Sequence, residues 1–389
     1  MTDIHGTTTP GFEAVRDAFA QNFADHAEVG AAVSVLHRGT PVVDLWGGIA
    51  DPSTGTPWRH DTLAPIASTT KAMVAIAVLH LADRGLLDID RPVADYWPAF
   101  AAEGKAGNTI RTLLSHRSGV VSLEHAPVTY DGLLAGTPVY DAIAAARPQW
   151  EPGTAHGYHG VTFGHLLGAV VQAVTGRTVG RYLAEEIARP IGLDCHIGLP
   201  ESALPRLAAL VIPTAIGEVA LGAGVPELAG LYTALGDPAS LTYRALYGSF
   251  QIGWDEASDP KFALVEAPST DGTASAAGLA RLFAATIGEV DGVRLFTADA
   301  GAVHASGLDR VLNIRTDWGL GFMVPGGPMF PAAVPAGAFG HGGATGSFAF
   351  ADPAADLAFA YTPNRGSELL EGNDLRVNGL ADALYACTG

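Results

Sequence analysis

The sequence predicts an α+β fold, in which an antiparallel sheet built from both ends of the chain is flanked by helices and carries a mainly helical insertion. Strand-like segments cluster near the two termini, and the middle is rich in Pro, Gly and helical runs. The chain has 389 residues, more than one hydrophobic core usually organises. We therefore expect an α/β domain over 1–84 and 306–389, a helical domain over 85–305, and the functional site between them.

The N-terminal elements follow from the spacing of apolar residues. Residues 10–27 place apolar side chains at intervals of three and four, which indicates an amphipathic helix. Residues 29–36 and 42–46 flank a short turn that contains glycine, which is typical of a β-hairpin. Residues 68–84 are largely apolar, lack Gly and Pro, and are followed by Gly85, so they predict a helix that ends at that glycine.

The rest of the chain adds helices in the middle and a sheet region at the end. We expect two helices in the middle, over 163–174 and 179–187. Three strands follow, over 318–324, 346–351 and 357–361, and the last two form a hairpin. A helix over 373–386 closes the chain.

The composition argues against several kinds of partner. The formal net charge is −18, so the surface repels nucleic acid and anionic lipid. No uncharged apolar run reaches the ~18 residues of a membrane span, and residues 1–10 lack the pattern of a secretory signal. Cys195 and Cys387 lie far apart without metal-ligand spacing, as free thiols of a reducing compartment would. We expect a soluble, cytoplasmic protein that binds neither nucleic acid nor membrane.

The first chemical signal is Ser68-Thr69-Thr70-Lys71 at the start of a predicted helix. Residues three apart share a helix face, so the amine of Lys71 can reach the hydroxyl of Ser68, and the helix N-terminus favours negative charge on that oxygen. The four-residue pattern is common by itself, and a capping serine with a solvated lysine would also produce it. However, the chain has only three lysines against 19 arginines, and this one lies in an apolar helix. Burial disfavours its charged form, so the pair suits an activated nucleophile.

A different serine mechanism can be tested directly on the sequence. The pattern Gly-x-Ser-x-Gly, the nucleophile elbow of α/β-hydrolases, is absent from the chain. The predicted sheet is also antiparallel, whereas that fold is built on a largely parallel one. An α/β-hydrolase is therefore not expected.

Two further segments complete a recognisable set: residues 150–160, centred on Tyr158, and the glycine-rich residues 340–347. With Ser68-Thr69-Thr70-Lys71 they resemble the serine β-lactamase and penicillin-binding-protein superfamily, and more closely its class C-like esterase branch, the family VIII carboxylesterases. The connecting segments 86–93 and 113–119 are similar as well, so the resemblance covers almost the whole chain.

The resemblance implies a role for each block. Ser68 would be the acylated nucleophile, Lys71 its proton partner and Tyr158 the third catalytic residue, and which of the last two is the general base stays open. The backbone N–H groups of Ser68 and Ala344 would form the oxyanion hole. The third block would lie on an edge strand beside the nucleophile.

The chain also departs from the β-lactamase pattern. Two residues after the tyrosine stands Gly160 in place of Asn or Ser, and His341-Gly342-Gly343 replaces Lys-Thr-Gly. A mostly neutral histidine there argues against anionic substrates. We expect His341, the two glycines and His159 to line the substrate pocket, with the glycines letting substrate approach the backbone.

A metal site is the alternative interpretation of the histidines. His156, His159 and His165 lack the His-Glu-x-x-His spacing, so no metal or other cofactor is expected. The predicted function is hydrolysis of small to medium acyl esters through an acyl-enzyme. The alternatives are a β-lactamase or D-Ala peptidase-like amidase, an acyltransferase of specialised metabolism, and a non-catalytic binding relative. The oligomeric state stays open.

Overall fold

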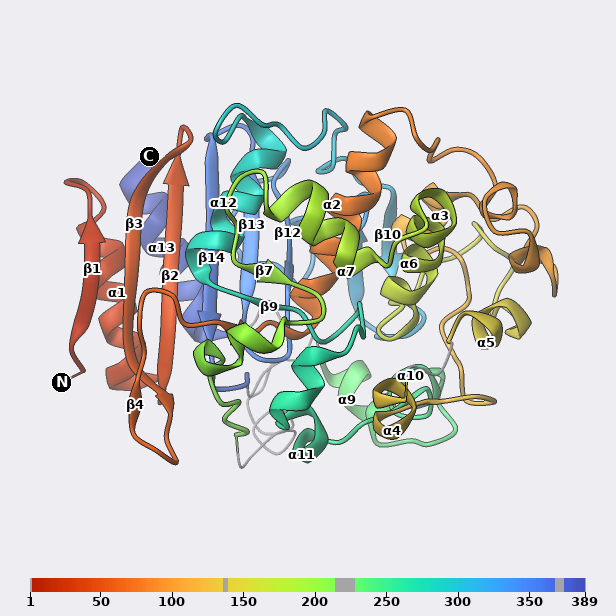
Figure 1. The fold of residues 1–389 in the computed structure, drawn as a ribbon, viewed down its shortest axis with the longest axis horizontal. Coiled ribbons are helices and arrows are strands. Elements are labelled where there is room, and N and C mark those ends of the chain that lie inside the picture. Colours follow the sequence, from red (N-terminus) through yellow and green to blue (C-terminus); the bar gives the residue numbers. More distant parts are fainter. Residues whose placement is uncertain (1, 136–138, 214–227, 368–373, 389) are drawn as a thin grey trace.

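The computed structural model describes residues 2–135, 139–213, 228–367 and 374–388 (Figure 1). Its main sheet is antiparallel and has the order β1-β3-β2-β14-β13-β12, with β4 paired to β3. The strands are β1 (Ile4–Thr8), β2 (Gly30–His37), β3 (Thr40–Asp51), β4 (Thr56–Pro57), β12 (Phe339–Gly342), β13 (Phe348–Asp352) and β14 (Leu357–Pro363). Because β2 pairs with β14, the two ends of the chain meet in the middle of the sheet, and the predicted α+β architecture is confirmed.

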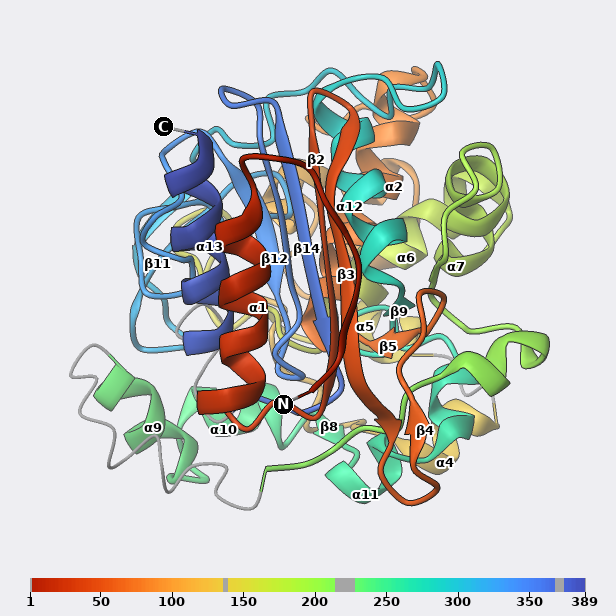
Figure 2. The same cartoon turned by 90° about the vertical axis from the view of Figure 1, so that its left-hand side faces the viewer.

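Helices cover both faces of this sheet. Figure 2 shows α1 (Glu13–Asp25) beside α13 (Leu375–Thr388) on one face and α12 (Ala276–Ile287) on the other. In β13, Phe348 and Phe350 join the core under α1 and α13, while Ala349 joins the core on the α12 side. In β14, Ala358 and Ala360 also belong to the α12 side. The period of two in a strand separates large from small residues, and the alanines let α12 approach the sheet closely.

The helical part packs around α2 (Thr70–Asp83), in which residues 70–81 are all buried. A helix that is apolar all round belongs in a core, and α2 packs against α6 (Thr162–Thr175). The other helices are α3 (Ile110–Leu114), α4 (Tyr130–Leu134), α5 (Tyr140–Ala145), α7 (Val179–Tyr182), α9 (Ala229–Leu235), α10 (Leu241–Leu246) and α11 (Trp254–Ala257). The small sheets are β5-β9-β7 (Ala64–Pro65, Thr273–Ala274, Cys195–His196), β6-β8 (Val128–Thr129, Phe250–Gln251) and β10-β11 (Ala305–Leu308, Arg315–Trp318).

The division into domains at 84/85 and 305/306 stays a prediction. Within the range assigned to the helical domain, α12 packs against β2, β13 and β14. Among the described residues, no helix is long and apolar enough to cross a membrane.

The predicted strand over 318–324 is wrong. β11 ends at Trp318, and within 319–324 only Met323 forms bridges, to Trp318 and to Gly340 of β12. The reason is Gly321, which has a φ of +87° and comes so close to α2 that an added Cβ would lie 2.4 Å from the Cβ of Ala75. A left-handed residue interrupts the strand and brings the chain against the helix. The strands β1 and β10 were not predicted from the sequence either.

Candidate active site

Ser68 and Lys71 lie where the chain enters α2. Ser68 is half-buried in the 3-10 turn Ala67–Thr69, and Lys71 is in the first turn of the helix. Nζ of Lys71 is 3.2 Å from Oγ of Ser68 and donates to the carbonyl oxygen of Ser269 at 2.9 Å. The lysine is fully buried. The structure thus brings the predicted pair within hydrogen-bonding distance, in a place shielded from water.

The turn that carries the nucleophile is strained and held from outside. Ala67 has a φ of +41°, a conformation that costs an ordinary residue free energy and that only the surrounding structure maintains. The backbone N–H of Ile66 donates to Gly272 at 2.8 Å, and the N–H of Gly272 donates to Oγ1 of Thr70 at 2.8 Å. These bonds bracket the turn, so Ser68 has a defined position before substrate arrives.

Tyr158 faces the same lysine from the loop that precedes α6. Nζ of Lys71 lies 4.9 Å from the centroid of the Tyr158 ring, which is 5% exposed. The ring stacks on Trp318, with centroids 5.4 Å apart and planes inclined by 5°. The backbone N–H of Tyr158 donates to Oδ1 of Asp309 at 3.0 Å. The three sequence-predicted catalytic residues therefore meet at one place.

The glycine-rich residues 340–347 form a third side of the site, beside the Ser68 turn and Tyr158. β12 stands at the end of the main sheet order and contacts the nucleophile turn. The chain then turns tightly, because Gly346 N–H donates to Gly343 at 2.8 Å and Gly343 N–H donates to Ser347 at 2.9 Å. An added Cβ on Gly343 would lie 2.3 Å from the carbonyl oxygen of Ile66, so only glycine fits there. Ala344, the predicted oxyanion donor, is exposed within this turn.

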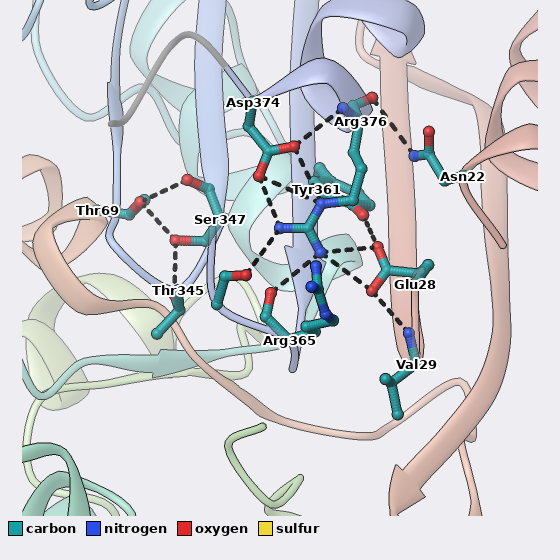
Figure 3. Close-up of polar contacts among 11 residues, drawn as sticks. Asn22, Glu28, Val29, Thr69, Thr345, Ser347, Tyr361, Arg365, Asp374 and Arg376 are labelled. Carbon is teal, nitrogen blue, oxygen red and sulfur yellow. Dashed lines mark hydrogen bonds and ion pairs between the residues drawn. The ribbon is translucent and has the colours of Figure 1, made fainter. Parts of the chain in front are cut away.

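Ser347 joins this turn to the nucleophile turn (Figure 3). Its Oγ lies 2.9 Å from Oγ1 of Thr69. The same oxygen donates to the carbonyl oxygen of Ile66 at 2.8 Å. Both bonds are buried, where a hydrogen bond is difficult to replace by water. The segments that carry Ser68 and Ala344, nearly 280 residues apart in sequence, are thus fixed to each other.

A buried ionic cluster lies on the opposite side of the turn (Figure 3). The guanidinium of Arg376 donates to Asp374 at 2.6 Å and to Glu28 at 3.3 Å, and Tyr361 also donates to Glu28. Burial raises the pKa of Glu28 above its ordinary value, although the charge of Arg376 opposes the shift. An added Cβ on Gly346 would lie 2.4 Å from Nη2 of Arg376, so the cluster packs directly against the turn.

Several histidines in the walls of the site are neutral. Burial lowers the pKa of His159 to about 3, and burial together with the charge of Lys71 lowers that of His341 to about 3. Burial likewise lowers the pKa of His116 well below its ordinary value. His159 and His341 are fully buried, so their side chains lie in the walls of the site rather than at its open surface. The interpretation of both as substrate contacts, like that of Gly342, stays a prediction.

The histidines considered for a metal do not come together. Nε2 of His156 lies 3.1 Å from Oγ1 of Thr316, whereas Nδ1 of His159 donates to Gly157 at 2.7 Å. Among the residues that the structure describes, no group of three or more His, Cys, Asp or Glu side chains could hold a metal ion.

Sequence reasoning missed several residues that shape the site. His116 accepts the backbone N–H of His159 at 3.1 Å and lies 4.1 Å from the ring of Trp318, centroid to centroid. In the sequence, its segment 113–119 is similar to the family only as connecting sequence. Asp309 and Ser269 belong to no recognisable pattern, and only the folded chain shows that they touch the site.

Comparisons with known proteins agree with this geometry. Residues 15–382 match the beta-lactamase family. The esterase/beta-lactamase LipL of Mycobacterium tuberculosis is 34% identical over 377 residues, which is 93% of this chain and 83% of the relative.

Solved structures give the same result. One described as a family VIII carboxylesterase has a TM-score of 0.86 at 36% identity, with 99% of this chain and 100% of the other covered. A penicillin-binding protein homologue from Caulobacter crescentus has a TM-score of 0.82 at 38% identity, with the same coverage. The fold that the resemblance implied is confirmed. The chain therefore belongs to the beta-lactamase family of serine hydrolases, in the branch of the family VIII carboxylesterases.

Proposed function

We propose that the protein hydrolyses carboxylic esters through an acyl-enzyme formed on Ser68. The observation that carries this proposal is the fully buried amine of Lys71, 3.2 Å from the Ser68 hydroxyl and beneath the ring of Tyr158. A long cationic side chain is rarely buried without a specific partner. Here it lies where an amine can exchange a proton with the nucleophile.

Acylation begins when Oγ of Ser68 attacks the ester carbonyl carbon. Its proton passes to Lys71 or Tyr158, and the carbonyl oxygen becomes an oxyanion. The backbone N–H groups of Ser68 and Ala344 stabilise that charge, which is larger in the transition state than in the ester, and such a donor contributes a factor of about 10²–10³ in rate. When the carbon–oxygen bond breaks, the alcohol leaves with the transferred proton and the acyl group stays on Ser68.

Deacylation repeats the sequence with water as the nucleophile. Water gives a proton to the same base and attacks the acyl carbon. Ser68 leaves as the alkoxide and takes that proton back, which releases the carboxylic acid. The same acyl-enzyme would pass its acyl group to an alcohol or amine wherever such an acceptor displaces water.

The charges of the site favour neutral esters, and we expect acyl groups of small to medium size. His341 occupies the position at which the β-lactamase pattern has a lysine, and its lowered pKa keeps it neutral at physiological pH. His159 is neutral for the same reason of burial. The cation that would attract the carboxylate of a β-lactam or peptide is therefore missing at residue 341, and His159 supplies no replacement, although Lys71 itself stays nearby.

The experiment compares the wild type with Ser68→Ala on p-nitrophenyl butyrate, a chromogenic cephalosporin and a D-Ala-D-Ala peptide. We expect fast ester hydrolysis, labelling by a phosphonate probe, and loss of both in Ser68→Ala. The buried Ser118 offers a matched control, since Ser118→Ala should keep activity and labelling. Ester hydrolysis retained by Ser68→Ala would contradict the proposal.

Two further measurements distinguish an esterase from an amidase and from an acyltransferase, which would use the same acyl-enzyme. Cephalosporin turnover faster than ester turnover would identify an amidase. Release of an acylated alcohol or amine far faster than acid, when an acceptor is added, would identify an acyltransferase. The cytoplasmic location stays a prediction and is tested by fractionating the source cells.

A further inference from the structure

Asp309 is a fully buried carboxylate behind the tyrosine side of the site. It lies directly after β10, in the loop that leads to β11. Its two oxygens accept five hydrogen bonds: to Oδ1 from the backbone N–H groups of Tyr158 (3.0 Å), Val311 (2.9 Å) and Leu312 (2.8 Å), and to Oδ2 from the Thr316 hydroxyl (3.1 Å) and the Trp318 indole (3.4 Å). Five donors on one carboxyl group match its ionised form, which only accepts.

Two of these bonds have an ordinary explanation. The N–H groups of Val311 and Leu312 lie two and three residues after Asp309, and an aspartate commonly closes its own turn in this way. Closing the turn accounts for these two bonds alone. The remaining three donors come from outside the turn, and two of them belong to Tyr158 and to its stacking partner Trp318.

Two of the three external donors lead to Tyr158. One is the backbone N–H of Tyr158 itself, and another is the indole of Trp318, whose ring stacks against the phenol with planes inclined by 5°. A single carboxylate thus holds the backbone from which the phenol extends and the surface on which the phenol rests. With both fixed, the phenol keeps its place above Nζ of Lys71, 4.9 Å from the ring centroid.

We propose that Asp309 is a positioning residue, which acts on the reaction through Tyr158 by fixing the place of its phenol oxygen relative to Ser68 and Lys71. The proposal rests on the catalytic role of Tyr158 under the proposed function. Proton transfer needs the acid or base within hydrogen-bonding reach, and a displacement of about 1 Å can cost about 10²-fold in rate. No charge transfer to Asp309 is involved.

Asp309→Asn is the central variant, because it keeps the shape and changes the hydrogen bonding. An amide that keeps its oxygen toward the three backbone N–H groups turns its NH₂ toward the indole N–H of Trp318, where donor meets donor. Relative to the titrated concentration of active sites, we expect kcat for p-nitrophenyl butyrate to fall roughly 10- to 100-fold and KM to change less than about threefold.

The decisive measurement repeats Asp309→Asn in a Tyr158→Phe background. If Asp309 acts through the phenol, the second change should lower kcat by less than about twofold once the phenol oxygen is gone. Losses that multiply in the double variant, or a KM that rises with kcat unchanged, would overturn the proposal. Full activity of Tyr158→Phe alone would instead contradict the catalytic role of the tyrosine, so the two failures are distinguishable.

Asp352→Asn is the matched control. Asp352 is also fully buried and accepts from Ala354 N–H, Ala355 N–H and the Tyr385 hydroxyl, at 3.0, 3.2 and 2.8 Å, in the turn between β13 and β14. It should lower the melting temperature and leave kcat unchanged.

Thr316→Val removes only one external donor and tests the proposal even if Asp309→Asn does not fold. It should lower kcat several-fold in the wild type and hardly at all with Tyr158→Phe. Equal losses in both backgrounds would count against a positioning role.

Discussion

Lys71 stands on the buried helix α2 and Ser68 on the 3-10 turn that leads into it, whereas Tyr158, which faces them, stands on a loop. On the helix side, the apolar core around residues 70–81 fixes α2 and Lys71 with it, and hydrogen bonds between the entry of the helix and Gly272 hold the turn that carries Ser68. On the loop side, regular geometry places nothing. The tyrosine depends on Asp309, 151 residues away, and on the stacking surface of Trp318.

The difference separates two ways of building a catalytic geometry. A packed helix places Lys71 through local hydrogen bonds, and a few bonds from outside hold the short turn of Ser68 directly before it. A loop acquires comparable precision only through long-range partners, and each of them is a point at which the geometry can fail. We therefore expect the helix side to be sensitive to changes in its own two residues, and the loop side to changes at some distance as well.

The largest effect is expected from Lys71→Met on the helix side. It removes the amine 3.2 Å from Ser68 and keeps the apolar stem, so kcat should fall by about 10³-fold or more. Lys105→Met is the matched control, because Lys105 is also fully buried but donates to Ala144 and Ala146, at 2.9 and 2.7 Å. The control should lose stability in urea and keep its kcat. Equal kcat values for the two variants would show that the amine of Lys71 has no role in the reaction.

Tyr158→Phe should be next, with kcat lower by about 10²- to 10³-fold and little change in fold, since the ring can still stack on Trp318. Tyr182→Phe serves as the control. Tyr182 is also buried, and its hydroxyl lies 2.9 Å from Nδ1 of His80 in the helical region. Steady-state kinetics with p-nitrophenyl butyrate provide the comparison. Similar kcat values for both variants would mean that the hydroxyl of Tyr158 takes no part in the reaction and that the ring only packs in the site.

Gly321→Ala tests how closely the two sides are pressed together. The new Cβ would lie 2.4 Å from Ala75 of α2, at a φ of +87°. Strain and overpacking should lower the free energy of unfolding by about 2–4 kcal/mol, with a several-fold loss of kcat. At Gly337, which has a φ of +96° and nothing within 4 Å of an added Cβ, alanine should show the strain alone, about 1 kcal/mol. Equal urea midpoints would contradict the close approach.

The smallest effect concerns stability at acid pH, and not catalysis. Burial, together with the charge of Lys71, lowers the pKa of His165 on α6 to about 4. The unfolded chain, with an ordinary histidine pKa near 6.5, therefore binds the proton more readily. Stability contributed by neutral His165 is present above about pH 6.5 and is lost as the pH falls toward 4.

Replacing this histidine by phenylalanine should remove about one proton from the pH dependence of unfolding, or about 1.4 kcal/mol per pH unit within that window. Urea unfolding of the wild type and His165→Phe at pH 5 and pH 7 measures the slope. An unchanged slope would show that this histidine is not kept neutral by the fold.

The outcome of the sequence predictions follows the same division. Elements set by local periodicity were predicted correctly, such as the helix at Glu13–Asp25 and the hairpin of β2 and β3. The strand predicted over 318–324 does not form, because the conformation of Gly321 is set by its close approach to α2, which is distant in sequence. The helix predicted over 68–84 also differs at its start. Ser68 lies in the strained 3-10 turn Ala67–Thr69, which hydrogen bonds from other segments maintain, and the α-helix begins at Thr70.

The sequence by itself determined the sheet made from both ends of the chain, the buried helix, and the pairing of Ser68 with Lys71. These depend on periods of two and three to four residues, which are local properties. Only the tertiary structure decided how the ring of Tyr158 lies over the lysine, that His341 is fully buried, and that Asp309 reaches across the fold to the tyrosine. Contacts of that kind depend on how distant segments pack, and no local pattern in the chain records them.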